Sequence, residues 1–153
     1  MTNSSLASPL EAHFGYWIRQ VSNSVSSRFQ KLIEAEGVSV TEWVALRILL
    51  DQKHTTHSEL IQSLGLTKGA TSKVISRLEE KGLLKRTLAK GSARDQLLVL
   101  TEKGRALVPR LALLADQNED HFFGHLDTAL RRELMCTFQS LAEFHNIQAP
   151  PLE

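Results

Sequence analysis

Apolar positions at helical spacing dominate both ends of this chain. They recur every three or four residues over 10–36 and again after Thr101, which predicts amphipathic helices in both regions. Gly37 is expected to end the first helix, Pro109 to bend the helix that follows Thr101, and Asp127 to cap a last helix. The apolar positions are Phe14, Trp17, Val21, Val25, Phe29 and Leu32 in the first region, and Leu107, Leu111, Leu114, Leu130, Leu134, Phe138 and Leu141 in the second.

The middle of the chain predicts three shorter helices followed by two strands. Ser or Thr followed three residues later by Glu is the sequence pattern of a capping box, and it occurs twice. Glycine ends helices because it tolerates a positive φ. In chain order the expected signals are the Ser39/Glu42 box, the Thr56/Glu59 box, the stop at Gly65, the cap Thr67 and the stop at Gly82. Leu83–Ala89 and Gln96–Leu100 are expected to be strands of a hairpin that turns at Gly91.

This order of helix, tight turn, helix and hairpin predicts the fold class. The chain is expected to be mainly α with a small β-hairpin wing, a winged helix-turn-helix flanked by N- and C-terminal dimerisation helices. We expect the terminal helices to associate with a second copy because no other element covers their apolar stripes; burial within one monomer is the alternative. The expected parts are a disordered leader 1–9, one domain 10–147 (dimerisation helices 10–37 and 101–147, winged module 39–100) and a tail 148–153 that stops being helical at Pro150.

Charge is concentrated in the same module. Residues 67–94 hold eight Lys and Arg against two Glu, a net charge of +6, whereas the rest of the chain holds ten basic and fifteen acidic residues. A basic segment of this kind indicates an interface with phosphate groups. A single cysteine fits a reducing cytoplasm, no apolar run is long enough to span a membrane, and no catalytic motif is present. The chain is therefore expected to be a cytoplasmic protein, not an enzyme, without cofactor or metal.

The helix predicted after Thr67 has two different faces. Ala70, Val74 and Leu78 recur at spacing four, with Thr71 and Ile75 beside them, and are expected to pack inward. The outward face is expected to hold small, hydroxyl and basic side chains, which suit entry into a DNA groove. Those residues are Gly69, Ser72, Lys73 and Ser76, with Lys68 and Arg77 at the edges. A solvated face is the alternative for such a helix taken alone.

These residues closely resemble the MarR family of bacterial transcription regulators, over about residues 10 to 146. The signatures are the entry to the second helix, the SEL and LGL of the helix-turn, the segment SRLEEKGLLKR, and Arg94 shortly before LTEKG. The resemblance implies a homodimer that presents two winged modules to DNA and is regulated by a small molecule or an oxidant. The family's usual acid two positions before the wing arginine is Ser92 here, and Asp95 is a substitute from the other side.

The DNA contacts follow from the helix, the wing and the helix-turn. Side chains on the outward helix face are expected to reach base edges in the major groove. Arg94 is expected to enter the adjacent minor groove, with Lys90 on a nearby phosphate. Thr55, Thr56 and Ser58 are expected to hydrogen bond the DNA backbone. The predicted partner is a pseudo-palindromic double-stranded operator, and repression is the expected outcome.

The resemblance to the MarR family implies an effector pocket between the dimerisation helices and the winged module. By position, the residues that would line it are His13, Tyr16, Trp17, Trp43 and Arg47, although core packing is an alternative for both tryptophans. Arg47 indicates an anionic or aromatic effector because a charge within an apolar helix can meet an anion.

Three other interpretations of the sequence are open. Cys136 would make the regulator redox-responsive if its thiolate were activated. His121 and His125 would make it metal-responsive if they shared a helix face with a third ligand. A winged-helix module that binds protein instead of DNA is the remaining rival.

Overall fold

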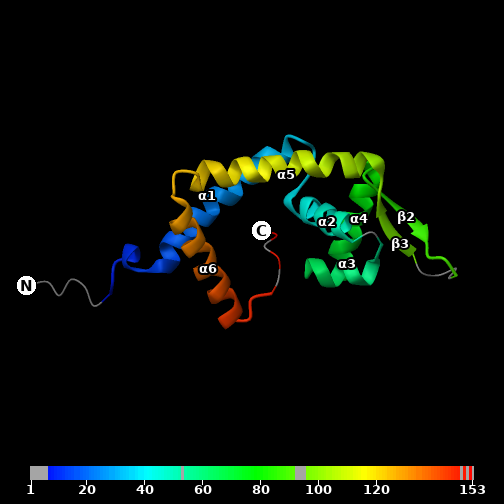
Figure 1. Cartoon of the computed structure of the whole chain (residues 1–153). Coiled ribbons are helices and arrows are strands. Elements are labelled where there is room, and N and C mark those ends of the chain that lie inside the picture. Colours follow the sequence, from blue (N-terminus) through cyan, green and yellow to red (C-terminus); the bar gives the residue numbers. More distant parts are fainter. Residues whose placement is uncertain (1–6, 53, 92–95, 149, 151, 153) are drawn as a thin grey trace, which may run out of the picture.

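The structure, a computed structural model, describes residues 7–52, 54–91, 96–148, 150 and 152. Long helices lie at both ends of the chain and a small sheet lies in its middle (Figure 1). The elements are a 3-10 turn Leu10–Ala12, α1 (Phe14–Glu34), α2 (Val40–Asp51), β1 (Thr55–Thr56), α3 (His57–Leu64), α4 (Lys68–Glu80), β2 (Leu84–Leu88), β3 (Gln96–Leu100), α5 (Glu102–Phe123) and α6 (Thr128–Phe144).

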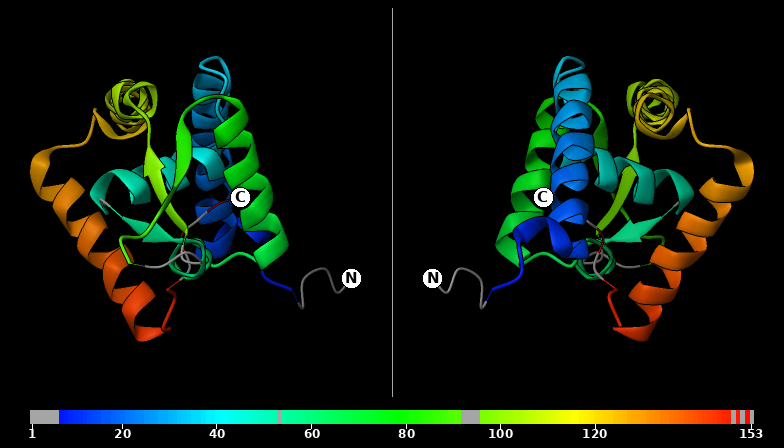
Figure 2. Two further views of the ribbon diagram at one scale, coloured as in Figure 1. Left: turned by 90° about the vertical axis from the view of Figure 1, so that its right-hand side faces the viewer. Right: turned by 90° about the vertical axis from the view of Figure 1, so that its left-hand side faces the viewer.

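The helices form two groups. α1 and α5 pack along each other, and α6 follows α5 back across the end of this pair (Figures 1 and 2). α2, α3, α4 and the sheet form a separate group against the other half of α5 (Figure 1). The expected winged module therefore lies at one end of a long helical arm.

One apolar core joins the winged module to α1 and α5. Its buried members come from every α-helix except α6, from β2 and β3, and from the segments that precede α2 and β2. Burying a leucine side chain contributes about 1.5–3 kcal/mol, so this core supplies most of the stabilisation of the module. The core consists of Ile33, Val38, Ala45, Leu46, Leu49, Leu60, Leu64, Val74, Ile75, Leu78, Leu83, Leu84, Leu98, Leu100, Val108 and Leu111.

The predicted helix starts are confirmed by their hydrogen bonds. The hydroxyl of Ser39 accepts from the N–H of Glu42 at 3.2 Å, and the Glu42 carboxylate accepts from the N–H of Ser39 at 2.9 Å. Thr56 and Glu59 form the second capping box in the same way. Thr67, Thr101 and Asp127 each accept a hydrogen bond from the third residue of the helix they precede.

Two helix boundaries and the number of strands differ from the sequence-based expectation. The first helix begins at Phe14, because residues 10–12 form a separate 3-10 turn and His13 is extended. The last helix ends at Phe144, well before Pro150, and Asn146 has a φ of 53°. The sheet has a third strand, β1, which pairs antiparallel with β3.

Candidate nucleic-acid interface and effector cleft

The helix-turn-helix is formed by α3 and α4, joined by a turn at Gly65. This glycine has a φ of 65°, in the left-handed region that favours glycine. The inner face of α4 is buried through Thr71, Val74, Ile75 and Leu78, as the spacing predicted, and Ala70 is half-buried. The opposite face is therefore free to meet a ligand.

The outward face of α4 over its first three turns carries no carboxylate. Gly69, Lys73 and Ser76 are exposed there, with Lys68 and Arg77 exposed at the edges. The two acidic residues of α4, Glu79 and Glu80, lie in its last turn. We call Lys68, Gly69, Lys73 and Ser76 the α4 outer face. Arg77 lies to one side of it, along a hollow at the α1–α2 turn.

Ser72 is less free than expected. Its side chain is half-buried, and its hydroxyl donates to the carbonyl of Lys68 at 2.8 Å and lies 3.3 Å from Nε2 of His57. These contacts fix the direction of the hydroxyl. They also place His57, which the sequence reasoning did not select, beside the α4 outer face.

Both threonines that were expected to contact DNA stabilise the fold. Thr55 is fully buried in β1, pairs with Leu98 across the sheet, and donates its hydroxyl proton to the side-chain oxygen of Gln52. It is therefore left out of the DNA surface. The side chain of Thr56 caps α3, whereas Ser58 is exposed in the first turn of that helix.

The Thr56 cap also stabilises the negative charge at the start of α3. The N–H of Thr56 donates to the Glu59 carboxylate at 2.7 Å. This hydrogen bond, aided by the Thr56 hydroxyl, lowers the pKa of Glu59 from its ordinary value of 4.5. Glu59 is therefore ionised at neutral pH and close to the helix N-terminus, where a negative charge is favourable.

The wing is the hairpin of β2 and β3, with Leu84 opposite Leu100 and Leu88 opposite Gln96. Lys90 and Gly91 are exposed beyond β2, and Gly91 has a φ of 90°. Arg94, Ser92 and Asp95 lie outside the described residues. The predicted role of Arg94 and its brace accordingly stay predictions.

The basic segment does not act as one patch. Lys81 donates to the Glu42 carboxylate at 2.7 Å, and Arg86 donates to the carboxylate of Glu79 at 2.9 Å. These two cations are therefore compensated within the fold. The cations of α4 that face solvent, and Lys85 and Lys90 of the wing, make no ion pair with any carboxylate in the described part of the chain.

A cleft of about 380 Å³ lies between α1, α2 and α5. Its apolar wall includes Phe29, Val44 and Trp43, whose ring meets that of Phe29 edge to face at 6.4 Å. Asn118 supplies a buried polar group in this wall. Its amide oxygen accepts from Arg28 at 3.0 Å and its amide nitrogen donates to the carbonyl of Val25 at 3.1 Å.

Only one of the five residues expected to bind an effector lines this cleft, and it is Trp43. His13, Tyr16 and Trp17 lie at the start of α1, about 20 Å along the helix from Phe29 at 1.5 Å per residue. Within one chain, the expected grouping of these three with Trp43 is therefore wrong. Arg47 is half-buried, pairs with Asp51 at 3.5 Å and lies 6.0 Å from the centre of the Trp43 ring.

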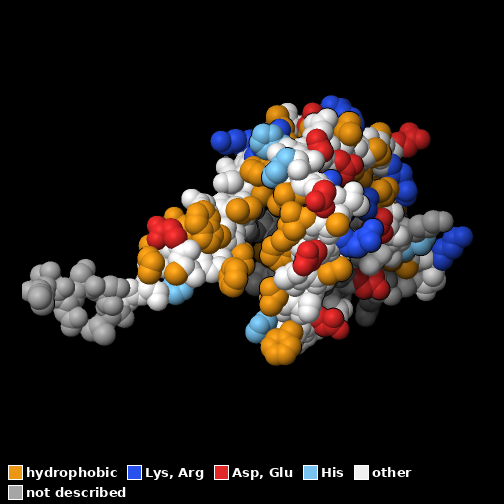
Figure 3. All heavy atoms as spheres, turned by 60° about the vertical axis from the view of Figure 1, so that its left-hand side comes forward, with side chains coloured by type: hydrophobic (Ala, Val, Ile, Leu, Met, Phe, Trp, Pro, Cys, Tyr) orange, Lys and Arg blue, Asp and Glu red, His pale blue; other side chains and the backbone are white. Residues whose placement is uncertain are grey.

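Large apolar side chains are exposed along α1 and α6. Phe14 is 88% exposed and Phe144 is 83% exposed, and α6 contains no buried residue. Figure 3 shows apolar side chains gathered on this side of the molecule. A hollow of about 510 Å³ between the two helices is lined by Trp17, Val21 and Phe138, among others. The remaining large exposed apolar residues of α1 and α6 are Ile18, Leu130, Met135 and Leu141.

The alternative sensing residues are also placed by the structure. His121 lies in α5, but α5 ends at Phe123 and His125 lies in the following turn. The two therefore do not share a helix face, and no group of three metal-ligand side chains forms among the described residues. Cys136 is exposed on α6. No helix in the described ranges has the length and apolar character needed to cross a membrane.

Comparison with known proteins adds a family to this geometry. Residues 36–95 match the family model described as MarR family. This span begins at the α1–α2 turn and includes the helix-turn-helix. The curated HTH-type transcriptional repressor Rv2887 of Mycobacterium tuberculosis is 24% identical over 131 residues, which are 86% of this chain and 94% of that protein.

Solved structures share the fold. BpsR of Bordetella bronchiseptica, whose DNA binding is regulated by 6-hydroxynicotinic acid, aligns with a TM-score of 0.75 and 24% identity, over 89% of this chain and 97% of its own. Rv2887 in complex with DNA aligns with a TM-score of 0.72 and 23% identity, over 88% and 98% of the two chains. The expected winged helix-turn-helix with long flanking helices is confirmed. The expectation that the chain is not an enzyme agrees with relatives that are named regulators and repressors.

Proposed function

We propose that this chain is a member of the MarR family, as the match over residues 36–95 and the similarity to Rv2887 support, and that it is a cytoplasmic transcriptional repressor that binds DNA as a homodimer and is released by a small molecule. The α4 outer face carries the proposal, because three turns of helix present small, hydroxyl and cationic groups to solvent without a carboxylate. Rv2887 supports the same function, because this protein has a similar fold, has been solved in complex with DNA and is named a transcriptional repressor.

We propose that α4 enters the major groove with its N-terminal half. Residues at the start of a recognition helix reach base edges in helix-turn-helix proteins, which assigns Gly69 and Lys73 to this role, and Ser76 continues the same face into the next turn. Lys68 and Ser58 lie close to the helix starts and suit phosphate contacts. Ser72 contributes its fixed hydroxyl oxygen, and the wing adds Lys90 and Arg94.

A second copy of the chain is the proposed occupant of the apolar surface on α1 and α6. An exposed surface with this many large apolar side chains is unusual for a monomer. A two-fold dimer buries the same patch on both copies. It also places two copies of α4 on one duplex, about 34 Å apart, so the operator is expected to be pseudo-palindromic.

The cleft between α1, α2 and α5 is the proposed effector site. Its wall combines aromatic rings with the polar Asn118, a pairing that suits an aromatic ligand with one polar group. The relative BpsR, which has a similar fold, responds to 6-hydroxynicotinic acid, an aromatic acid. A ligand here would touch both the dimerisation helices and α2 of the winged module, so it would change the separation of the two α4 helices.

A gel-shift titration on duplexes selected from a random pool tests this function. We expect a retarded complex whose affinity falls steeply with salt, because cations on the protein displace counterions from DNA. Arg94→Ala is expected to weaken the complex at least about tenfold without unfolding the protein, because it removes a guanidinium from the minor groove. If no duplex is selected and no salt-dependent affinity is found, a winged-helix protein-interaction module becomes the better interpretation.

A further inference from the structure

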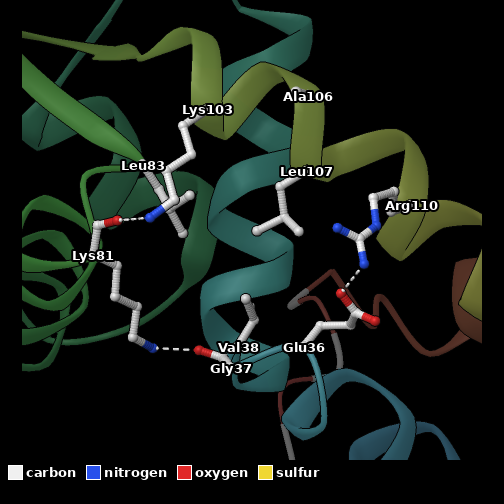
Figure 4. Close-up of a pocket in the computed structure, with 9 residues that line it drawn as sticks. All are labelled: Glu36, Gly37, Val38, Lys81, Leu83, Lys103, Ala106, Leu107 and Arg110. Carbon is white, nitrogen blue, oxygen red and sulfur yellow. Dashed lines mark hydrogen bonds and ion pairs between the residues drawn. The ribbon is translucent and has the colours of Figure 1, made fainter.

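A second hollow, of about 500 Å³, opens on α5 and shares no lining residue with the proposed effector cleft. It lies between the first turns of α5, the α1–α2 turn and the segment that joins α4 to β2 (Figure 4). Val38, Leu83 and Leu107 form its apolar centre. Lys81 and Lys103 lie at one end and Arg110 at the other (Figure 4).

The lysine ammonium groups of this hollow use only some of their N–H donors in hydrogen bonds with the described residues. The Lys103 ammonium donates to the carbonyl of Lys81 at 2.8 Å and forms no ion pair with a carboxylate of the described residues. A lysine ammonium has three protons, so Lys103 has two left. Lys81 uses two of its three, on the carbonyl of Gly37 and on Glu42.

Arg110, at the other end of the hollow, also has N–H donors that are not used within the described residues. One guanidinium nitrogen of Arg110 donates to the Glu36 carboxylate at 2.7 Å, and a guanidinium has five N–H donors. Lys81, Lys103 and Arg110 thus supply three positive charges, against two negative charges from Glu36 and the buried Glu42. The hollow therefore has a net positive charge and unused donors at both ends of an apolar centre.

We propose that this hollow binds an organic anion with a short apolar body, of the class of arene carboxylates. Lys103 and Lys81 would donate to the carboxylate. The arene would lie on Leu107 and Ala106 and on the aliphatic stem of Lys103. The site goes beyond the proposed function, and binding to it does not depend on DNA binding by the chain.

The position of the hollow gives such a ligand contact with two parts of the fold at once. Lys81 caps the C-terminus of α4, and Leu83 immediately precedes β2. Lys103, Leu107 and Arg110 lie on α5, which continues to the dimerisation surface. A bound anion therefore holds the end of the recognition helix against the dimerisation arm.

Titration of the full chain with 2-naphthoate, followed by amide NMR, tests the proposal. Glycine amides provide local reporters: Gly37 lines the hollow and Gly104 packs on Leu83, whereas Gly65 and Gly69 lie in the helix-turn-helix. We expect the Gly37 and Gly104 signals to move with a saturable dependence on naphthoate while Gly65 and Gly69 stay in place. Neither acetate, which lacks the apolar body, nor the neutral 2-naphthalenemethanol is expected to reproduce the shifts.

Two variants and a matched control locate the binding. Lys103→Gln removes the unpaired cation, and Ala106→Leu fills the hollow from an exposed helical position. Lys103→Gln is expected to weaken naphthoate binding at the Gly37 signal at least about fivefold, the scale of a partly exposed charge-assisted hydrogen bond. Ala106→Leu is expected to weaken it as well, because the added side chain occupies the space of the arene. Arg105→Gln removes a neighbouring exposed cation of α5 that does not line the hollow, and it is expected to leave the affinity unchanged.

Each contrary result overturns the site. Unmoved Gly37 and Gly104 signals would show that the hollow does not take the anion, even if naphthoate binds in the α1–α2–α5 cleft. Equal affinities for wild type, Lys103→Gln and Ala106→Leu would have the same meaning. Failure of DNA binding by the chain leaves this readout intact, so the two proposals fail separately.

Discussion

Adding one methyl group at Gly104 is expected to strain the junction between the winged module and α5. Gly104 is a buried residue in the first turn of α5, and its N–H donates to the Thr101 hydroxyl at 3.1 Å. A Cβ built there would lie closer than 3.0 Å to the carbonyl oxygen of Leu83 and 3.1 Å from its carbonyl carbon. Backbone atoms must therefore move, because no flexible side chain is there to yield.

The expected loss of stability follows from three contributions. Overpacking of a well-packed site costs about 1–3 kcal/mol. Displacing Leu83 also weakens the hydrogen bond that its carbonyl accepts from the N–H of Thr101 at 3.1 Å, worth about 1 kcal/mol. Alanine offsets about 1 kcal/mol through its higher helix propensity. Gly104→Ala is therefore expected to lower the free energy of unfolding by about 1–3 kcal/mol.

Gly69→Ala is the matched control, because it makes the same substitution in α4 where nothing lies within 4 Å of the new Cβ. We expect it to raise the free energy of unfolding by about 0.5–1 kcal/mol. Urea unfolding followed by circular dichroism compares both variants with wild type at one protomer concentration, since the proposed dimerisation would make stability depend on concentration. A Gly104→Ala variant as stable as wild type, or two variants that shift in the same direction, would refute the packing described for this junction.

Three further substitutions test separate parts of the account. Lys68→Gln, at the position assigned to a phosphate contact, is expected to reduce the slope of log affinity against log salt by about one and to weaken all duplexes alike, whereas Lys31→Gln, which removes an exposed cation of α1, should change neither in a gel-shift series. Glu42→Gln is expected to cost about 1–3 kcal/mol in urea unfolding, because Glu42 is only 2% exposed and accepts from Lys81; wild-type stability would show that this ion pair contributes nothing. The pKa of Glu59 is lowered on folding, so the stabilisation by its carboxylate is present at neutral pH and is lost as the pH falls below about 4.5. Glu59→Gln should therefore be less stable than wild type at pH 7 and equally stable in acid, and a difference in stability that does not depend on pH would contradict this assignment.

Local signals in the sequence predicted most of the helices and the start of nearly every one. The Ser39/Glu42 and Thr56/Glu59 boxes are read correctly because each involves residues three apart, and Gly65 closes its helix through its own backbone conformation. The 3-10 turn before α1 was missed because its apolar Leu10 continues the helical spacing. Periodicity records which residues share a face and does not show a break at His13.

Contacts between distant parts of the chain could not be predicted in this way. β1 has two residues, too few to show an alternation, and it exists because β3 lies beside it some forty residues later. Thr55 was therefore taken for a surface residue. Arg28 and Asn118 meet only when α1 packs on α5, so no spacing in the sequence indicates that they lie beside the proposed effector cleft. The sequence also does not separate Lys81 from the other cations of the basic segment, because the carboxylate that compensates its charge, Glu42, comes from α2.

A hydroxyl-radical footprint of the wild-type protein on a selected duplex tests the central claim most directly, namely that two copies of α4 enter successive major grooves. The account predicts two protected segments related by a pseudo-two-fold, centred about one helical turn or roughly 34 Å apart. It also predicts that both segments lose protection together in Lys73→Gln at raised salt. A single protected segment, or protection that Lys73→Gln leaves unchanged, would contradict it.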